Sequence, residues 1–102
     1  MQIALEAIAN PRRRAILRLV WKRELSAGEI ASNFDVSWPA VSQNLRILRD
    51  AGLVTERRDG NRRLYRADRR ALGPLAKAVQ SMWEEDLAQL KRVVESDRRR
   101  AR

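Results

Sequence analysis

The stretch that decides the fold is residues 26–67, SAGEIASNFDVSWPAVSQNLRILRDAGLVTERRDGNRRLYRA. Ser26 and Glu29 form the S-x-x-E pattern of a capping box, in which each side chain binds a free backbone N–H at the start of a helix. Ser37 is a second N-cap, and Pro39 follows in the first turn, where the missing N–H of proline is tolerated. The stretch therefore predicts a short helix, a tight turn and a second helix, in that order.

The second of these helices, residues 37–51, is predicted to bury one of its faces. Val41, Leu45 and Leu48 recur at helical spacing, and Gly52 supplies the stop. The opposite face carries small, amide and arginine side chains, which are the types that hydrogen-bond to the edges of DNA bases. An ordinary solvated face has the same composition, and for this helix taken alone that is the simpler interpretation.

A basic hairpin is predicted to follow the second helix. Residues 53–56 and 63–66 have strand character, and Asp59-Gly60 between them is a strong hairpin signal. Four arginines crowd its tip, and their mutual repulsion favours phosphate binding over a solvated surface. A helix-turn-helix followed by such a hairpin is a compact device for contacting duplex DNA. The second helix enters the major groove, and the hairpin lies along the backbone.

Composition limits the possible functions further. The 102 residues suffice for one domain, and a net charge of +9 suits a polyanionic partner, although an arginine-rich soluble domain has the same balance. The chain has no Cys and no His, which removes disulfides, zinc fingers, thiol chemistry and His-based catalysis. We therefore expect no enzyme activity, no cofactor and no bound metal. Without a membrane-spanning run or a signal peptide, we expect a cytoplasmic protein with no membrane partner.

Both ends of the chain also have helical patterns. Residues 3–9 are apolar on one side, and Asn10-Pro11 interrupts this helix and starts the next. From Leu75 onward, apolar residues recur at spacings of three and four over several turns. Such a long stripe needs a partner surface, and the same helix of a second subunit is the simplest one; folding back onto its own domain is the alternative. We expect one domain over residues 1–97 and a solvated basic tail over 98–102.

Five segments carry a resemblance to a known family. They are ANPRRRAIL (9–17), LSAGEIA (25–31), VSWPAVSQNL (36–45), LRDAGLV (48–54) and GNRRLY (60–65). In this order and spacing they resemble the ArsR family of bacterial winged-helix transcriptional repressors, over essentially the whole chain. The resemblance implies a mainly α fold with a small β-hairpin and a winged helix-turn-helix in each subunit of a homodimer. It also implies an interface made by the first and last helices, and repression from an inverted repeat, often that of the protein's own operon.

The residues and the resemblance together predict three sets of site residues. In the recognition helix, the residues expected to contact DNA are Ser37, Trp38, Pro39, Ser42, Gln43, Asn44 and Arg46. In the wing, residues 55–66, they are Arg57, Arg58, Asn61, Arg62 and Arg63. The dimer interface is expected to consist of Ile3, Leu5, Ile8, Val79, Met82, Trp83, Leu87, Leu90 and Val94.

The chain departs from the family pattern at two positions of the recognition helix. Asn44 stands where members often carry His, and because Asn also hydrogen-bonds, we expect a changed sequence preference rather than a changed role. Trp38 is bulkier than the small or polar residue expected there. It either packs against the sugar-phosphate backbone or a thymine methyl group, or fills the gap between the two helices.

A further departure concerns sensing. The family's metal sites use Cys, or His with carboxylates, and its redox sensors use Cys pairs, so this chain resembles the branch without either ligand set. Glu84-Glu85-Asp86 are expected to form a solvated face that pairs with Lys91 or Arg92. The leading hypothesis is a sequence-specific repressor. The alternatives are a non-specific architectural DNA binder and a protein–protein interaction module that uses the long last helix.

Overall fold

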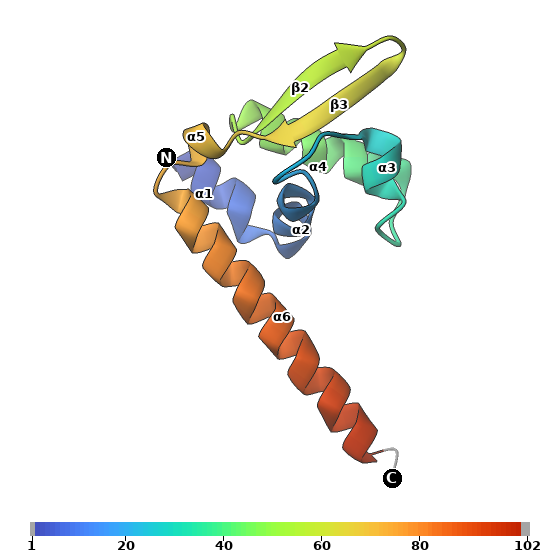
Figure 1. Cartoon of the computed structure of the whole chain (residues 1–102), viewed down its shortest axis with the longest axis vertical. Coiled ribbons are helices and arrows are strands. Elements are labelled where there is room, and N and C mark those ends of the chain that lie inside the picture. The colour runs from blue at the N-terminus through green and yellow to red at the C-terminus, as the bar shows by residue number, and fades with distance from the viewer. Residues whose placement is uncertain (1, 101–102) are drawn as a thin grey trace.

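The structure is a computed structural model that describes the backbone of residues 2–100 and the side chains of residues 3–89 and 91–96 (Figure 1). A mainly helical body carries a small antiparallel sheet, as the sequence predicts, and a long last helix extends away from it. In chain order the elements are α1 (Gln2–Ala9), α2 (Pro11–Leu19), β1 (Leu25–Ser26), α3 (Ala27–Ala31), α4 (Trp38–Asp50), β2 (Val54–Asp59), β3 (Arg62–Ala67), α5 (Arg69–Leu72) and α6 (Leu75–Arg100).

Side-chain caps determine where four of the helices begin. Asn10 Oδ1 accepts the backbone N–H of Arg12 at 2.9 Å, and Pro11 occupies the first turn of α2. The capping box of α3 is complete: Ser26 Oγ accepts the N–H of Glu29 at 3.2 Å, and Glu29 Oε1 accepts that of Ser26 at 3.0 Å. The side chains of Ser37 and Asp68 cap α4 and α5 in the same way. The predicted helix starts at Asn10, Ser26 and Ser37 are therefore confirmed.

The sheet has three antiparallel strands in the order β1-β3-β2. The hairpin of β2 and β3 extends from Val54 opposite Ala67 to Asp59 opposite Arg62, and Gly60 turns it with a φ of +64°. The sequence does not indicate β1, because two residues are too short to establish a strand pattern. By pairing Leu25 with Tyr65, β1 fixes the base of the hairpin directly beside the start of α3.

One hydrophobic core joins these elements. It contains the α4 residues Val41, Leu45 and Leu48, each at most 2% exposed, so the predicted buried face is confirmed. Phe34 and Val36, in the turn between α3 and α4, are partly buried against this core. Gly52 closes α4 with a φ of +76°, which any residue with a Cβ adopts only under strain. The recognition helix is thus held rigidly from within.

Two arginines fasten the end of α1. Arg13 Nε donates to the carbonyl of Ala7 at 2.8 Å, and Arg14 Nη1 donates to those of Ile8 and Ala9 at 2.9 and 3.0 Å. These carbonyls have no partner within a helix that ends there, and the positive charges also suit its C-terminus. Arg14 Nη2 lies 3.5 Å from Asp86 Oδ2 of α6. The expected pairing of the acidic cluster with Lys91 or Arg92 is therefore wrong for Asp86, which instead links α6 to α2.

Replacing Arg14 with Met is expected to lower the free energy of unfolding by about 1–3 kcal/mol, because two carbonyls and Asp86 lose a charged donor. Chemical denaturation monitored by circular dichroism measures this change. The matched control is Arg12→Met, which removes an exposed arginine from the same helix and should change stability by no more than about 0.5 kcal/mol. Equal stability of the two variants would contradict the role given to Arg14.

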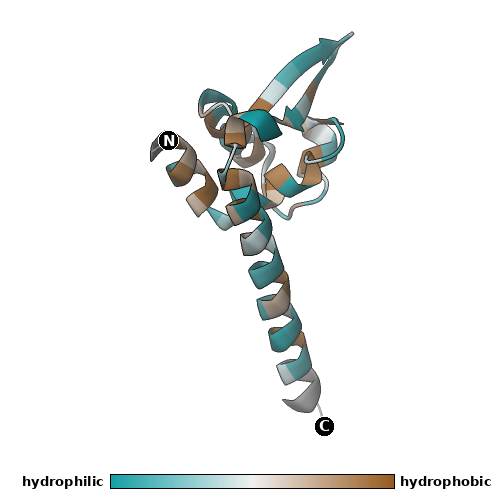
Figure 2. Ribbon diagram, turned by 60° about the vertical axis from the view of Figure 1, so that its left-hand side comes forward, coloured by the Kyte–Doolittle hydropathy of each residue, from teal (hydrophilic) through white to brown (hydrophobic). Residues whose placement is uncertain are grey.

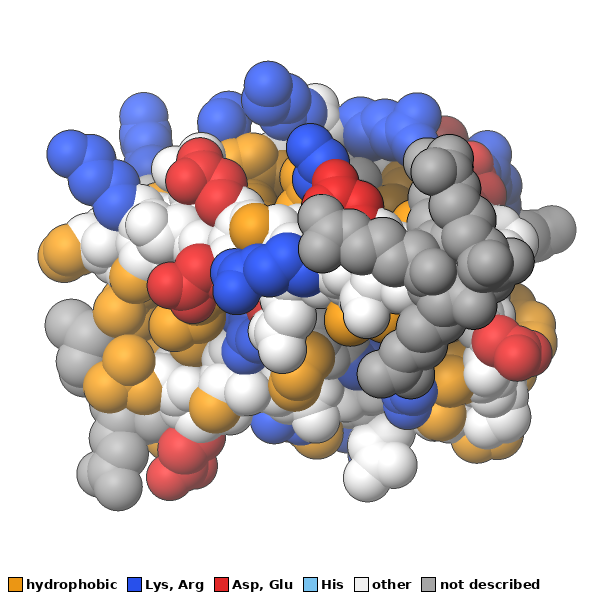
Figure 3. All heavy atoms as spheres, turned by 90° about the horizontal axis from the view of Figure 1, so that it is seen from below, with side chains coloured by type: hydrophobic (Ala, Val, Ile, Leu, Met, Phe, Trp, Pro, Cys, Tyr) orange, Lys and Arg blue, Asp and Glu red, His pale blue; other side chains and the backbone are white. Residues whose placement is uncertain are grey.

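The two halves of helix α6 have different surroundings. Its first turns pack on the body, and the rest extends beyond it, where Figure 2 shows hydrophobic positions recurring along the helix. Leu87, Val93 and Val94 are about half exposed on this part, at 55%, 54% and 46%. Figure 3 shows further hydrophobic side chains exposed among charged ones on the side from which α6 extends. The helix continues to Arg100 and so includes residues 98–100, which we expected to belong to the basic tail; residues 101 and 102 lie outside the described part.

The predicted interface residues differ widely in exposure within one chain. Ile8, Val79 and Trp83 are 2%, 0% and 9% exposed, because the body's own core already buries them. Of the others, Ile3, Leu5, Leu87 and Val94 are exposed and Met82 is intermediate, whereas the side chain of Leu90 lies outside the described residues. The first half of the last helix thus folds back onto its own domain, and the outer half leaves its apolar residues exposed. Among the described residues, no helix is both long and apolar enough to cross a bilayer.

Candidate nucleic-acid interface

Helix α4 presents a polar face opposite its buried stripe. Pro39, Gln43 and Arg46 are exposed there, Ser42 is exposed on a flank of the helix, and Ser37 is exposed just before the helix begins. The chain folds this way locally because the apolar residues recur every three to four positions and leave the polar ones on the outside. The structure thus leaves these five predicted residues accessible, with three of them on the face opposite the buried stripe.

Asn44 differs from the other predicted residues of α4. Its side chain is only partly exposed, and Nδ2 donates to the carbonyl of Ala40 at 3.0 Å, one turn earlier in the same helix. One of the two amide N–H groups of Asn44 is therefore already engaged before any ligand arrives. Gln43 and Arg46, in contrast, are exposed on this helix.

Trp38 packs against α3 and also faces solvent. A Cβ added to Gly28 would lie 3.5 Å from Trp38 Cζ2, so the indole edge covers the bare backbone of α3. The residue nevertheless remains 55% exposed. Its position therefore combines the two alternatives left open by the sequence: one edge fills the gap between the helices, and the rest is free to contact a ligand.

Recognition helix and wing meet along a concave strip. A hollow of about 410 Å³ is lined by Trp38 and Ser42 of α4, by Asn61, Arg62 and Arg63 of the wing, and by the start of α3. A smaller hollow of about 150 Å³ shares Ser42, Arg63 and Tyr65 with it and adds Arg46 and Arg49. Helix residues and wing residues that the sequence predicts separately therefore line the same surface.

Acidic partners hold several of the wing arginines. Arg57 makes a two-pronged ion pair with Glu24, with Nε–Oε2 and Nη2–Oε1 distances of 2.8 and 2.9 Å. Arg62 Nη2 lies 2.6 Å from Glu29 Oε1 of the α3 capping box. These pairs offset the repulsion expected from the sequence. Arg58 is exposed and has no ion pair among the described residues.

A further acidic side chain, that of Glu56, lies at the base of the wing. Glu56 Oε2 is 3.0 Å from Arg49 Nη1 of α4, and Glu56 Oε1 is 3.6 Å from Arg63 Nε. Glu56 therefore bridges the recognition helix and the wing and fixes their relative position. Arg49 and Glu56 are missing from the predicted site, because their pairing depends on the packing of α4 against β2.

Hydrogen bonds favour the ionised form of two acidic groups of this surface, Glu24 and Glu29. The side-chain hydrogen bond from Arg57 holds the pKa of Glu24 below its ordinary value. The backbone N–H and the hydroxyl of Ser26, followed by Arg62, do the same for the pKa of Glu29. At neutral pH both carboxylates are therefore negatively charged and paired with wing arginines.

The fold and this surface define a class of protein. A capped helix-turn-helix whose second helix lies beside an arginine-bearing antiparallel hairpin is a winged helix-turn-helix DNA-binding domain. Residues 10–56 match the family model described as "Bacterial regulatory protein, arsR family". The chain belongs to this family, whose members are DNA-binding regulators of transcription and not enzymes.

Relatives match over different lengths of the chain. The HTH-type transcriptional regulator Rv2034 of Mycobacterium tuberculosis is 36% identical over 94 residues, which cover 92% of this chain and 88% of that protein. The transcriptional repressor SdpR of Bacillus subtilis is 38% identical over 60 residues, which cover 59% of this chain and 67% of that protein. Among solved structures, the homodimeric winged helix-turn-helix domain Mb0332 of Mycobacterium bovis has a TM-score of 0.71 at 33% identity, over 82% of this chain and 78% of that one. The similarity therefore extends well beyond residues 10–56.

Proposed function

We propose that this protein is a sequence-specific transcriptional repressor that binds an inverted-repeat operator as a homodimer. The observation that carries the proposal is the concave strip that Trp38, Ser42 and Arg46 of α4 line together with the arginine-bearing wing. Relatives named as repressors, SdpR among them, support the direction of regulation. A repressor at its own promoter would block transcription by occupying the DNA.

In the proposed complex, α4 enters the major groove. Gln43 and Arg46 hydrogen-bond to base edges, because both project from the exposed face and carry the donors and acceptors that base recognition uses. Ser42 and Trp38 contact the backbone beside them. A purely architectural binder would need only the charge and not this polar helix face.

The wing binds phosphate in this proposal. Its ion pairs are exposed, and exposed pairs contribute only about 0.2–1 kcal/mol each. The arginines can therefore exchange a carboxylate for a phosphate oxygen at little cost. Glu24 and Glu29 remain beside the DNA and repel its phosphates. This repulsion weakens binding to DNA whose bases α4 does not recognise.

Replacing Arg58 with Ala is expected to weaken binding to all DNA sequences alike and to reduce the slope of log K against log salt concentration by about one unit. The physical reason is the loss of one phosphate contact from a residue without an acidic partner in the described part. Salt-dependent fluorescence anisotropy measures both quantities. The matched variant Glu24→Gln should act in the opposite direction, because it frees Arg57 for phosphate. Unchanged affinity and slope for Arg58→Ala would count against the wing assignment.

Dimerisation is proposed to involve α1 and the outer half of α6. Ile3, Leu5, Leu87 and Val94 are exposed there, and covering them with the same surface of a second subunit removes their apolar area from water. A two-fold axis between the subunits would place two α4 helices in successive major grooves. The homodimeric state given for the Mycobacterium bovis domain supports this arrangement.

A mobility-shift experiment tests the proposed function directly. The labelled DNA is the region upstream of the protein's own gene, and the competitor is unrelated genomic DNA in large excess. A repressor with base-specific contacts is expected to retain a defined complex under these conditions. For an architectural binder, the amount of labelled complex would fall in proportion to the concentration of competitor DNA. A protein–protein module would form no complex with the labelled DNA.

A further inference from the structure

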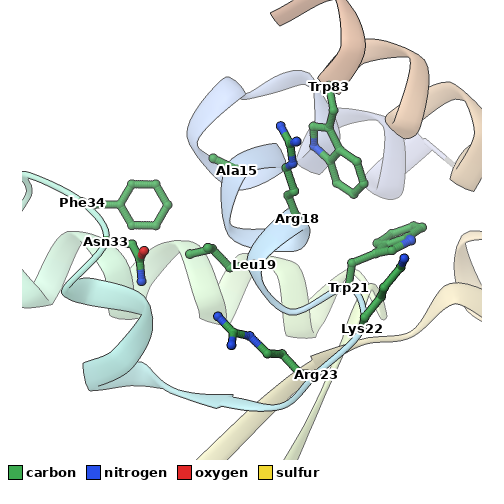
Figure 4. A pocket seen from close by; sticks show the side chains of 9 residues that line it. All are labelled: Ala15, Arg18, Leu19, Trp21, Lys22, Arg23, Asn33, Phe34 and Trp83. Atoms are coloured by element: carbon green, nitrogen blue, oxygen red, sulfur yellow. The ribbon is translucent and has the colours of Figure 1, made fainter. Parts of the chain in front are cut away.

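A pocket lies away from the DNA-facing surface, where α2 meets α6 and the turn after α3. Its volume is about 600 Å³, within the range of roughly 300–1,000 Å³ that is usual for small-molecule sites. Figure 4 shows Phe34 and Asn33 on one side of it and Trp21 and Trp83 on the other, with Leu19 of α2 between them. None of the residues that line it belongs to the predicted DNA-binding set.

Two tryptophans form a rigid wall of this pocket. The rings of Trp21 and Trp83 meet edge to face, with centroids 4.9 Å apart and an interplanar angle of 90°. Trp83 Nε1 donates to the carbonyl of Arg14 at 2.9 Å, so its polar atom is satisfied and its ring can offer apolar contact. The guanidinium of Arg69 lies 6.0 Å from the Trp21 ring centroid and helps to hold it. This wall is already formed before any ligand binds.

The charged side chains that line the pocket are all positive. Arg18, Lys22 and Arg23 line it and are exposed, and none of the described lining residues is acidic. The described residues also provide no ion pair to any of these three cations. Three such cations beside an apolar wall favour an anion that carries a flat hydrophobic body.

We propose that this pocket binds a small aromatic carboxylate. Its ring would lie among Phe34, Trp21 and Trp83, and its carboxylate would pair with Arg18, whose guanidinium lies beside Trp83 in Figure 4. The site also suggests regulation, which rests on the proposed function. Phe34 and Asn33 belong to the turn that sets α4 relative to α3, and Trp83 belongs to α6. A ligand there contacts both the DNA-reading unit and the base of the proposed dimer helix.

The binding experiment needs no DNA. The chain has three tryptophans, so the variant Trp38→Phe leaves Trp21 and Trp83, both in the pocket, as the only indole fluorophores. The probes are 2-naphthoate and its uncharged analogue 2-naphthamide. We expect saturable quenching by 2-naphthoate, with binding about tenfold or more tighter than that of the amide, because the charged hydrogen bonds are lost with the latter.

A matched pair of variants locates the site. Arg18→Gln in the same background should weaken naphthoate binding about tenfold and leave naphthamide binding unchanged, whereas Arg12→Gln, on the same helix but outside the pocket, should change neither. Both positions are exposed, so folding is not at risk. Absence of saturable quenching, or equal affinity for acid and amide, would overturn the proposal. Binding seen only after Leu87→Asp makes the protein monomeric would also overturn it, because a second copy would then fill the pocket.

The regulatory part is tested separately in proteins that retain Trp38. 2-Naphthoate is expected to change the affinity for operator DNA in the wild-type protein and not in Arg18→Gln. Unchanged DNA affinity at saturating naphthoate would overturn the regulatory part. Failure to bind any specific DNA would instead contradict the proposed function and leave the quenching result standing.

Discussion

Replacing Leu87 with Asp is expected to make the protein monomeric and to weaken binding to a two-fold-symmetric operator roughly 10²–10⁴-fold. Leu87 is 55% exposed on the outer half of α6, where we propose that a second subunit covers it. An unpaired carboxylate buried in that interface would be strongly disfavoured. Each half-site would then be bound independently, without the gain from linking two recognition helices. Sedimentation equilibrium and fluorescence anisotropy measure the two effects.

The control for this variant is Ala88→Asp. It adds the same charge to the same exposed half of α6, but on the side away from the apolar stripe, with Glu84 and Arg92 one turn to either side. It should remain a dimer with nearly unchanged affinity. A Leu87→Asp protein that sediments as a dimer and binds DNA normally would refute the proposed interface.

Replacing Gln43 with Ala is expected to cost roughly 1–3 kcal/mol of binding free energy at one base position in each half-site and to relax the preference there. Gln43 is exposed on α4, and its amide offers both a donor and an acceptor to a base edge. Because the buried stripe of α4 is untouched, the stability of the fold should not change. Competition binding against operators altered at single positions measures the effect.

Gln89→Ala is the matched control, because it removes the same exposed side chain from α6 instead of α4. It should leave every operator variant bound as before. If Gln43→Ala lowered the affinity for all sequences equally, the residue would contact the backbone, and its assignment to base recognition would be wrong.

The sequence predicts best those features that local chemistry determines. The N-caps at Asn10, Ser26 and Ser37 lie within a few residues of the backbone groups that they bind, and the stripe of α4 follows helical spacing alone. The strand positions of the wing follow in the same way from Asp59-Gly60 and the flanking residues. For this reason the recognition helix and the wing could be located without coordinates.

Features that depend on distant contacts could not be predicted. Arg14 looks like part of a polar helix face, yet it binds the end of α1 and Asp86, 72 positions away. Glu24 precedes the unpredicted strand β1, so its pairing with Arg57 has no sequence signal. The apolar stripe of α6 is continuous in sequence, and only the packing on α2 separates buried Trp83 from exposed Leu87. Periodicity identifies a face of a helix but does not identify what covers it.

In-vitro selection of bound sequences from random duplex DNA tests the central claim of base-specific recognition by a dimer most directly. We predict an enriched inverted repeat whose half-sites are centred about 10 bp apart, or a multiple of that distance, because two dyad-related α4 helices must enter major grooves on one side of the duplex. The enriched sequence should also lose its advantage for the Gln43→Ala protein at one position of each half-site. The claim of base-specific recognition would be contradicted if the recovered sequences shared no symmetric motif and if their affinity depended on salt concentration alone.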